Sequence, residues 1–221
     1  MMKILGICAS PRSSKSTTLR LVQALLNGAK EAGAEVELVD VCDLDIKFCN
    51  ACQVCFKTGV CVQKDDFQGL YDKILAADGL VWGSPNYFHT VTAQMKTLID
   101  RMADAVHCQL LTGKYCASVA SGGSNFDQVT TYLDGLMINF GAFVTGSIGV
   151  AMNQGPAAME EAEKKATLLG KSLAEDIRIK RDYIEQREMQ EEIREYFKAL
   201  VKMNKDSWEH EYEYWNRLNW N

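Results

Sequence analysis

The chain has 221 residues, of which 47% are hydrophobic and 24% charged, and this composition excludes a disordered, collagen-like or wholly coiled-coil protein. The 29 acidic and 24 basic residues give a formal net charge of -5, which argues against a nucleic acid or an anionic membrane surface as the main partner. No apolar run approaches the ~20 residues of a membrane span, and the first residues lack the basic region and cleavage site of a signal peptide. We therefore expect a cytoplasmic protein with no nucleic-acid partner and no membrane partner.

Short apolar runs alternate with amphipathic stretches along the first 180 residues, which is the pattern of βα units on a parallel sheet. The expected strands lie at residues 3–8, 36–41, 79–83, 115–120 and 143–150. The expected helices lie at residues 16–33, 67–77, 91–106, 126–140 and 158–180. This order predicts an α/β fold, a doubly wound five-stranded parallel sheet of the flavodoxin-like or Rossmann-like kind. Such sheets bind ligands beyond the carboxyl ends of their strands.

Residues 181–221 differ in character from the domain expected at residues 1–180, and we expect them to form a C-terminal helical arm. They are dense in charge, yet apolar residues recur three and four positions apart, which predicts an amphipathic helix. The residues of this stripe are Met189, Ile193, Tyr196, Leu200 and Met203. The stripe lies outside the predicted sheet and needs a partner, either the body of its own domain or another subunit. We expect a subunit contact, and hence a homodimer or homotetramer.

A polar segment at residues 9–18 joins the first strand to the first helix. It has neither the G-x-G-x-x-G of a dinucleotide site nor the G-x-x-x-x-G-K-[ST] of a P-loop. Hydroxyls and backbone N–H groups at a helix N-terminus instead suit a single phosphate. The candidate residues are Ser10, Arg12, Ser16, Thr17 and Thr18. The alternative is an ordinary helix N-cap, where Ser and Thr are common.

Two further loops reach the same edge of the predicted sheet. The loop after the third strand offers a fixed turn, an amide and two aromatic faces, against which a planar heterocycle could lie. The loop after the fourth strand contains glycines that let the backbone approach a ligand closely. The residues concerned are Pro85, Asn86, Tyr87 and Phe88 in the first loop, and Ser121, Gly122 and Gly123 in the second. Nearby His89 is a candidate proton donor or an ordinary loop histidine.

Residues 42–65 show no regular hydrophobic period, and four of the eight cysteines cluster within thirteen residues of this segment. A connection this long is usually functional, and a cysteine cluster in a chain without an export signal more often binds a metal or does redox work than forms disulfides. The cysteines are Cys49, Cys52, Cys55 and Cys61. Their C-x2-C-x2-C-x5-C spacing lets four thiolates converge on one iron–sulfur cluster. Zinc and free thiols are the alternatives. Asp65 and Asp66, which follow, are expected to cap the next helix.

Several of these motifs together resemble the flavodoxin-like NADPH-dependent FMN reductases over roughly residues 1–180. They are the S-P-R-x-x-x-S-T-T start, the G-S-P-x-Y-F loop followed by Met95-Lys96-x-x-x-Asp100-Arg101, and the S-G-G after the fourth strand. The resemblance implies that the FMN phosphate binds at Ser10, Arg12, Ser16, Thr17 and Thr18. It implies that the isoalloxazine ring lies between Pro85, Asn86, Tyr87 and Phe88 on one side and Ser121, Gly122 and Gly123 on the other. Lys96, Asp100 and Arg101 are expected to hold their helix or a subunit interface.

The compact cysteine motif resembles that of the iron–sulfur flavoproteins, in which it holds a 4Fe-4S cluster. The two resemblances imply an FMN-dependent oxidoreductase that takes electrons from NAD(P)H or a ferredoxin-like donor and passes them to a small-molecule or quinone acceptor. The cofactor supplies the chemistry, so no catalytic side chain is expected. The alternative is a non-catalytic flavodoxin-type electron carrier that docks a protein partner.

Overall fold

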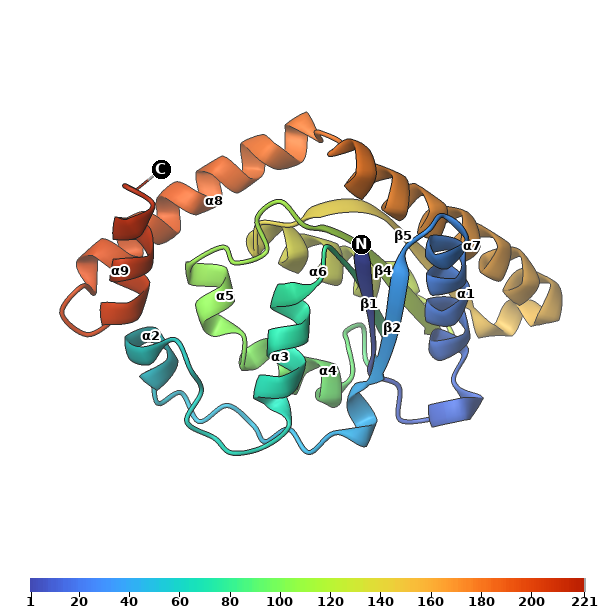
Figure 1. The fold of residues 1–221 in the computed structure, drawn as a ribbon. Helices are drawn as coiled ribbons and strands as arrows, with labels where there is room; N and C mark the ends of the chain where they lie inside the picture. The colour runs from blue at the N-terminus through green and yellow to red at the C-terminus, as the bar shows by residue number, and fades with distance from the viewer. Residues whose placement is uncertain (221) are drawn as a thin grey trace.

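The computed structural model describes residues 1–220, and its strands form one parallel sheet in the order β2-β1-β3-β4-β5 (Figure 1). The strands are β1 (Lys3–Cys8), β2 (Glu35–Asp40), β3 (Gly79–Pro85), β4 (Tyr115–Gly122) and β5 (Phe143–Ala151). This topology confirms the α/β, flavodoxin-like fold class. The strand order reverses between β1 and β3, and the carboxyl ends on either side of such a reversal border the crevice where these sheets bind ligands.

Helices cover both faces of the sheet (Figure 1). One face is covered by α1 (Thr17–Glu31) and α7 (Gly155–Ile179), and the other by α3 (Phe67–Ala76), α4 (Ala93–Asp100), α5 (Ala103–His107) and α6 (Phe126–Asn139). Alternate residues of β1 enter the two cores: Ile4 and Cys8 face α1, while Leu5 and Ile7 face the other layer. A strand buried on both faces is apolar, which explains the continuous apolar run at residues 4–8 after the exposed Lys3.

Helices α1 and α7 approach each other through two glycines. A Cβ atom on Gly28 would lie 1.9 Å from the carbonyl oxygen of Thr167, and one on Gly170 would lie 1.9 Å from the carbonyl oxygen of Leu25. Both distances are far inside van der Waals contact, so the two backbones touch where no side chain fits between them.

The prediction of a single helix at residues 91–106 is wrong, because the chain forms two helices, α4 and α5, with a break at Arg101 and Met102. Both side chains are buried there. Three short 3-10 helices complete the description: η1 (Ser13–Lys15), η2 (Val41–Asp43) and η3 (Met152–Gln154). None of the helices formed by residues 1–220 combines the length and apolar character of a membrane span.

The C-terminal arm consists of α8 (Ile184–Met203) and α9 (Glu209–Arg217), and it folds back along its own chain (Figure 1). The Gln186 side chain accepts from Val144 N at 2.7 Å and donates to Val144 O at 2.9 Å, so α8 covers the edge strand β5. Covering an edge in this way blocks pairing with another chain. Helix α9 then returns to α2 (Val54–Thr58), inside the cysteine segment.

Part of the predicted apolar stripe of the arm packs against the rest of the chain, and part of it faces solvent. Ile193 and Leu200 are half-buried, whereas Met189, Tyr196 and Met203 are exposed. Part of the arm therefore packs against its own chain, and the outer side of α8 presents the rest.

Candidate functional site

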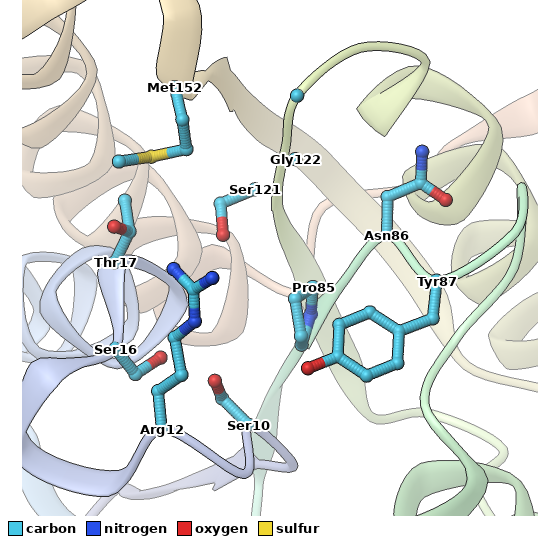
Figure 2. A pocket seen from close by; sticks show the side chains of 11 residues that line it. Ser10, Arg12, Ser16, Thr17, Pro85, Asn86, Tyr87, Ser121, Gly122 and Met152 are labelled. Carbon is cyan, nitrogen blue, oxygen red and sulfur yellow. The ribbon is translucent and has the colours of Figure 1, made fainter.

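A cavity of about 280 Å³ opens at the carboxyl edge of the sheet, where β1, β3 and β4 end (Figure 2). Its lining residues are Ser10, Arg12, Ser16, Thr17, Pro85, Asn86, Tyr87, Ser121, Gly122, Gly123 and Met152. The structure thus brings together all the residues predicted to contact FMN except Thr18 and Phe88. Parallel strands place their carboxyl ends at one edge, which is why three loops far apart in sequence meet here.

Hydroxyl groups and one guanidinium form the part of the cavity next to α1. Ser16 is the N-cap of α1, and its Oγ accepts from the backbone N–H of Leu19 at 3.0 Å. Ser10 is buried beside it, and Arg12 extends from the loop toward the middle of the cavity (Figure 2). The N-terminal N–H groups of a helix, its dipole and a guanidinium together favour an anion.

Thr18 lies behind this wall of the cavity. It is fully buried, and its Oγ1 is 2.7 Å from the Oγ of Ser121. The bond ties the first turn of α1 to the end of β4. Thr18 therefore positions Ser121, which lines the cavity, and does not line it itself.

The loops after β3 and β4 are locked to each other across the cavity. The backbone N–H of Asn86 donates to Ser121 O at 2.7 Å, and its side-chain Nδ2 donates to Ser124 O at 2.7 Å. A Cβ atom on Gly122 would lie 2.9 Å from the Cβ of Asn86. Glycine is needed at this position because the side chain of Asn86 occupies the space beside it.

Phe88 lies at the tip of a turn and does not line the cavity. Tyr87 and Thr90 exchange two backbone hydrogen bonds, of 2.9 and 3.2 Å, so Phe88 and His89 form a two-residue turn. Phe88 is 99% exposed and does not contact the cavity, in contrast to the expected ring contact. The tight turn is the reason, since it carries Phe88 to the tip while Tyr87 stays at the wall.

Sequence reasoning missed Met152, which lines the cavity from η3, directly after β5. Its side chain lies at the same wall as Thr17 and Ser121 (Figure 2). The signal was available, because the fifth strand also ends at the carboxyl edge of the sheet and its following loop belongs to the same set.

The four clustered cysteines are spread along the segment between β2 and α3. Cys49 and Cys52 are exposed, and Cys55 and Cys61 are half-buried. Within residues 1–220, no three His, Cys, Asp or Glu side chains gather closely enough to hold a metal ion. The thiols suit an iron–sulfur cluster by type and spacing, but as they lie in this structure they do not form a ligand set.

A buried ion pair closes the base of the cysteine segment. Arg101 Nη1 and Nη2 lie 2.8 and 3.2 Å from the carboxylate of Asp65, and Nη1 also donates to Lys47 O at 2.8 Å. The side chains of Arg101 and Asp65 are 1% and 0% exposed. Burial alone would raise the pKa of Asp65, but the hydrogen bonds from Arg101, Lys47 N–H and Phe67 N–H outweigh it and hold that pKa below its ordinary value. As expected, Arg101 has a structural position and does not line the cavity.

The other end of the segment packs under α9. The ring of Phe56 lies 4.8 Å from that of Trp208, and Trp208 stacks on His107 at 4.8 Å. His107 Nδ1 is 3.1 Å from the fully buried carboxylate of Glu211. The cysteine segment is therefore fixed at its base by Arg101 and near Phe56 by the C-terminal arm, with Cys49 and Cys52 on the exposed stretch between.

A five-stranded parallel sheet with an anion-favouring, partly aromatic cavity at its switch point defines a flavodoxin-like α/β protein. The family model described as NADPH-dependent FMN reductase matches residues 2–157. The chain belongs to the NADPH-dependent FMN reductase family, and it is thus an oxidoreductase of a flavin-dependent family.

Individual relatives agree with this assignment. The chain is 32% identical to an iron–sulfur flavoprotein of Archaeoglobus fulgidus over 97% of either chain. It is 40% identical over 131 residues to an iron–sulfur flavoprotein of Methanocaldococcus jannaschii, which covers 59% of this chain and 67% of that protein. A solved structure of a flavone reductase has a TM-score of 0.64 at 25% identity, covering 80% of this chain and 63% of that one. This chain therefore spans less than two thirds of the flavone reductase.

Proposed function

We propose that the cavity binds FMN and that the protein passes electrons through it from NAD(P)H or a ferredoxin-like donor to a small-molecule or quinone acceptor. The observation that carries this proposal is the meeting of an anion-favouring helix N-terminus and an aromatic loop in one cavity at the switch point. The family supports the cofactor. Bound FMN would supply reversible two-electron chemistry, as flavins do.

The side chains of this cavity would bind and orient the cofactor. Ser10, Ser16 and Thr17 would donate hydrogen bonds to the phosphate, and Arg12 would contribute charge. Tyr87 would present its ring to the isoalloxazine, and Gly122 would let the backbone approach the opposite side. The Asn86 and Thr18 hydrogen bonds fix these walls before the cofactor arrives, which reduces the entropy lost on binding.

Arg12→Ala should weaken FMN binding by about tenfold, since a charge-assisted hydrogen bond contributes about 1.5–3 kcal/mol and Arg12 is partly screened by solvent. Riboflavin has no phosphate, so its affinity should change little. Fluorescence titration of the flavin-free protein measures both affinities. Arg20→Ala is the control, because Arg20 lies on α1 and pairs with Glu163 outside the cavity. Equal losses for FMN and riboflavin would place the phosphate elsewhere.

The donor and the carrier alternative are tested together. Anaerobic mixing with NADH, NADPH or a reduced ferredoxin identifies which of them bleaches the flavin. Multiple turnovers with a small acceptor would support an enzyme, whereas reduction without turnover would support a flavodoxin-type carrier.

We also propose that the protein forms a homodimer or homotetramer. The exposed Met189, Tyr196 and Met203 of α8 support this proposal. Sedimentation of the full chain measures the mass of the assembly.

We further propose that Cys49, Cys52, Cys55 and Cys61 bind a 4Fe-4S cluster. The proposal is supported by their spacing and by the iron–sulfur flavoproteins among the relatives. Binding would require the exposed segment to rearrange. Ala51 and Gln53, between these cysteines, have positive φ angles of 54° and 60°, a conformation that costs about 1–2 kcal/mol for a non-glycine residue and that a rearrangement could release.

Anaerobically purified protein should contain about four iron and four sulfide per chain if this proposal holds. Cys52→Ser should lose most of the iron and keep FMN. Cys42→Ser is the matched control, because Cys42 is half-buried at the start of the segment but outside the motif. Zinc without sulfide, or no metal with four titratable thiols, would each refute the cluster.

A further inference from the structure

The turn at the rim of the cavity presents an aromatic side chain that residues 1–220 leave uncovered. Phe88 is 99% exposed, although its neighbour Tyr87 lines the cavity. Single exposed apolar residues are ordinary on protein surfaces. This one differs in its backbone and in the contacts that hold it.

The backbone of the turn is strained. Phe88 has a φ of 52° and His89 a φ of 68°, so both residues of this two-residue hairpin are left-handed. Such turns favour Asn and Gly, which adopt positive φ readily. The chain instead has a phenylalanine at the first position and a histidine at the second. Strain of this kind persists where the surroundings impose it, and it concentrates at ligand sites.

The loop after β4 contacts this turn through Asn125. The Nδ2 of Asn125 lies 3.3 Å from the Nδ1 of His89, and Asn86 Nδ2 donates to Asn125 O at 3.3 Å. Asn125 is itself left-handed, with a φ of 52°. The turn is thus fastened to the loop after β4, and its backbone places Phe88 next to Tyr87 at the rim of the cavity.

We propose that Phe88 is the platform on which the planar conjugated ring of the second substrate stacks at the mouth of the cavity. This inference rests on the proposed function, because it needs a flavin in the cavity with which that substrate reacts. An aromatic side chain offers a large contact area and has only two torsion angles to order on binding, and two aromatic rings gain from offset stacking. The ring recognised is either the nicotinamide of the donor or the ring of a quinone-type acceptor. Phe88 is then a specificity-determining residue and not a holder of FMN.

The test uses the FMN-loaded full chain with Phe88→Ala, Phe88→Leu and Phe88→Tyr. In stopped-flow experiments, photoreduced protein is mixed with a naphthoquinone or with hexacyanoferrate(III), which has no ring. In a second arm, oxidised protein is mixed with NADH or NADPH. We expect the half-saturating concentration of the quinone or of the nicotinamide to rise about two- to tenfold in the Ala and Leu variants. Phe88→Tyr should restore it, and the arm that responds identifies the ring.

Leu168→Ala is the control, since Leu168 is an exposed apolar residue on α7 that lies outside the cavity. The proposal is overturned if the half-saturating concentration changes for neither the quinone nor the nicotinamide. It is also overturned if the reaction with hexacyanoferrate(III) is slowed as strongly, or if Phe88→Leu behaves like the wild type. A change in the oligomeric mass of the protein on Phe88→Ala would also overturn it, because that result would place Phe88 in a contact between subunits. A wild-type protein that holds no flavin would refute the proposed function itself, which the Phe88 variants cannot do.

Discussion

Arg101→Leu is expected to lower the free energy of unfolding by about 3–5 kcal/mol, because it leaves the buried carboxylate of Asp65 without its partner. The side chain of Asp65 is fully buried, so water cannot replace the lost guanidinium. The same change removes the bond to Lys47 O and the contact of the guanidinium with the ring of Phe67, whose centroid lies 4.4 Å away. Urea unfolding measures this loss, provided that the m value, the slope of the unfolding free energy against urea concentration, is the same for both proteins.

The control for this variant is Lys96→Leu on α4, the helix that ends directly before Arg101. Lys96 pairs with Asp100, but both side chains are about half exposed, and an exposed pair contributes less than about 1 kcal/mol. Equal losses in the two variants would contradict the role given to the buried pair. In the wild type, the contribution of Asp65 should be fully present above its ordinary pKa of 3.8 and lost as pH falls through its lowered folded value. Arg101→Leu should therefore flatten the acid limb of the stability profile.

Gly170→Ala is expected to destabilise the protein by about 3 kcal/mol or more, the upper range for overpacking. The added methyl would lie 1.9 Å from the carbonyl oxygen of Leu25, and a backbone atom cannot move aside as a side chain can. Helix α7 would have to separate from α1 and uncover apolar surface on both. Thermal unfolding should show the loss as a fall in Tm of several degrees.

Gly135→Ala is the matched control, because Gly135 lies inside α6 and a Cβ there would meet nothing within 4 Å. Alanine is the better helix former, so this change should raise stability by about 0.5–1 kcal/mol. The same substitution, glycine to alanine, is thus expected to lower the stability at position 170 and to raise it at position 135. Gly28→Ala should resemble Gly170→Ala, and the double variant should lose less than the sum, since one separation of the helices accommodates both methyl groups.

The sequence allowed the sheet and most of the cavity wall to be predicted, because both follow from local patterns. Each strand is a short stretch in which apolar residues either follow one another or alternate with polar ones, and the polar loop after it must reach the carboxyl edge of a parallel sheet. Met152 shows that the same rule, applied to the fifth strand, would have completed the wall. Phe88 shows its limit, since a Phe-His pair gives no signal of a two-residue turn that normally takes Asn and Gly.

The pairings between distant segments could not be predicted. Asp65 was expected to cap α3, and it does accept from Phe67 N at 3.2 Å, but its main partner is Arg101. That partner also explains the break between α4 and α5, where the chain turns its buried arginine toward the cysteine segment. The reversal before Trp208 has no Gly or Pro to mark it. It depends on aromatic contacts with Phe56 and His107, which only the folded chain reveals.

The contact between α9 and α2 also sets an order of events during synthesis. Every residue that lines the cavity lies before α7 in the chain, so the ribosome has made the whole cavity wall before it reaches α9. The cysteine segment, although translated early, acquires its aromatic cover only with the last helix. The part of the chain that lines the cavity can therefore fold before the cysteine segment receives this cover, and we expect the contact between α9 and α2 to be among the last to form.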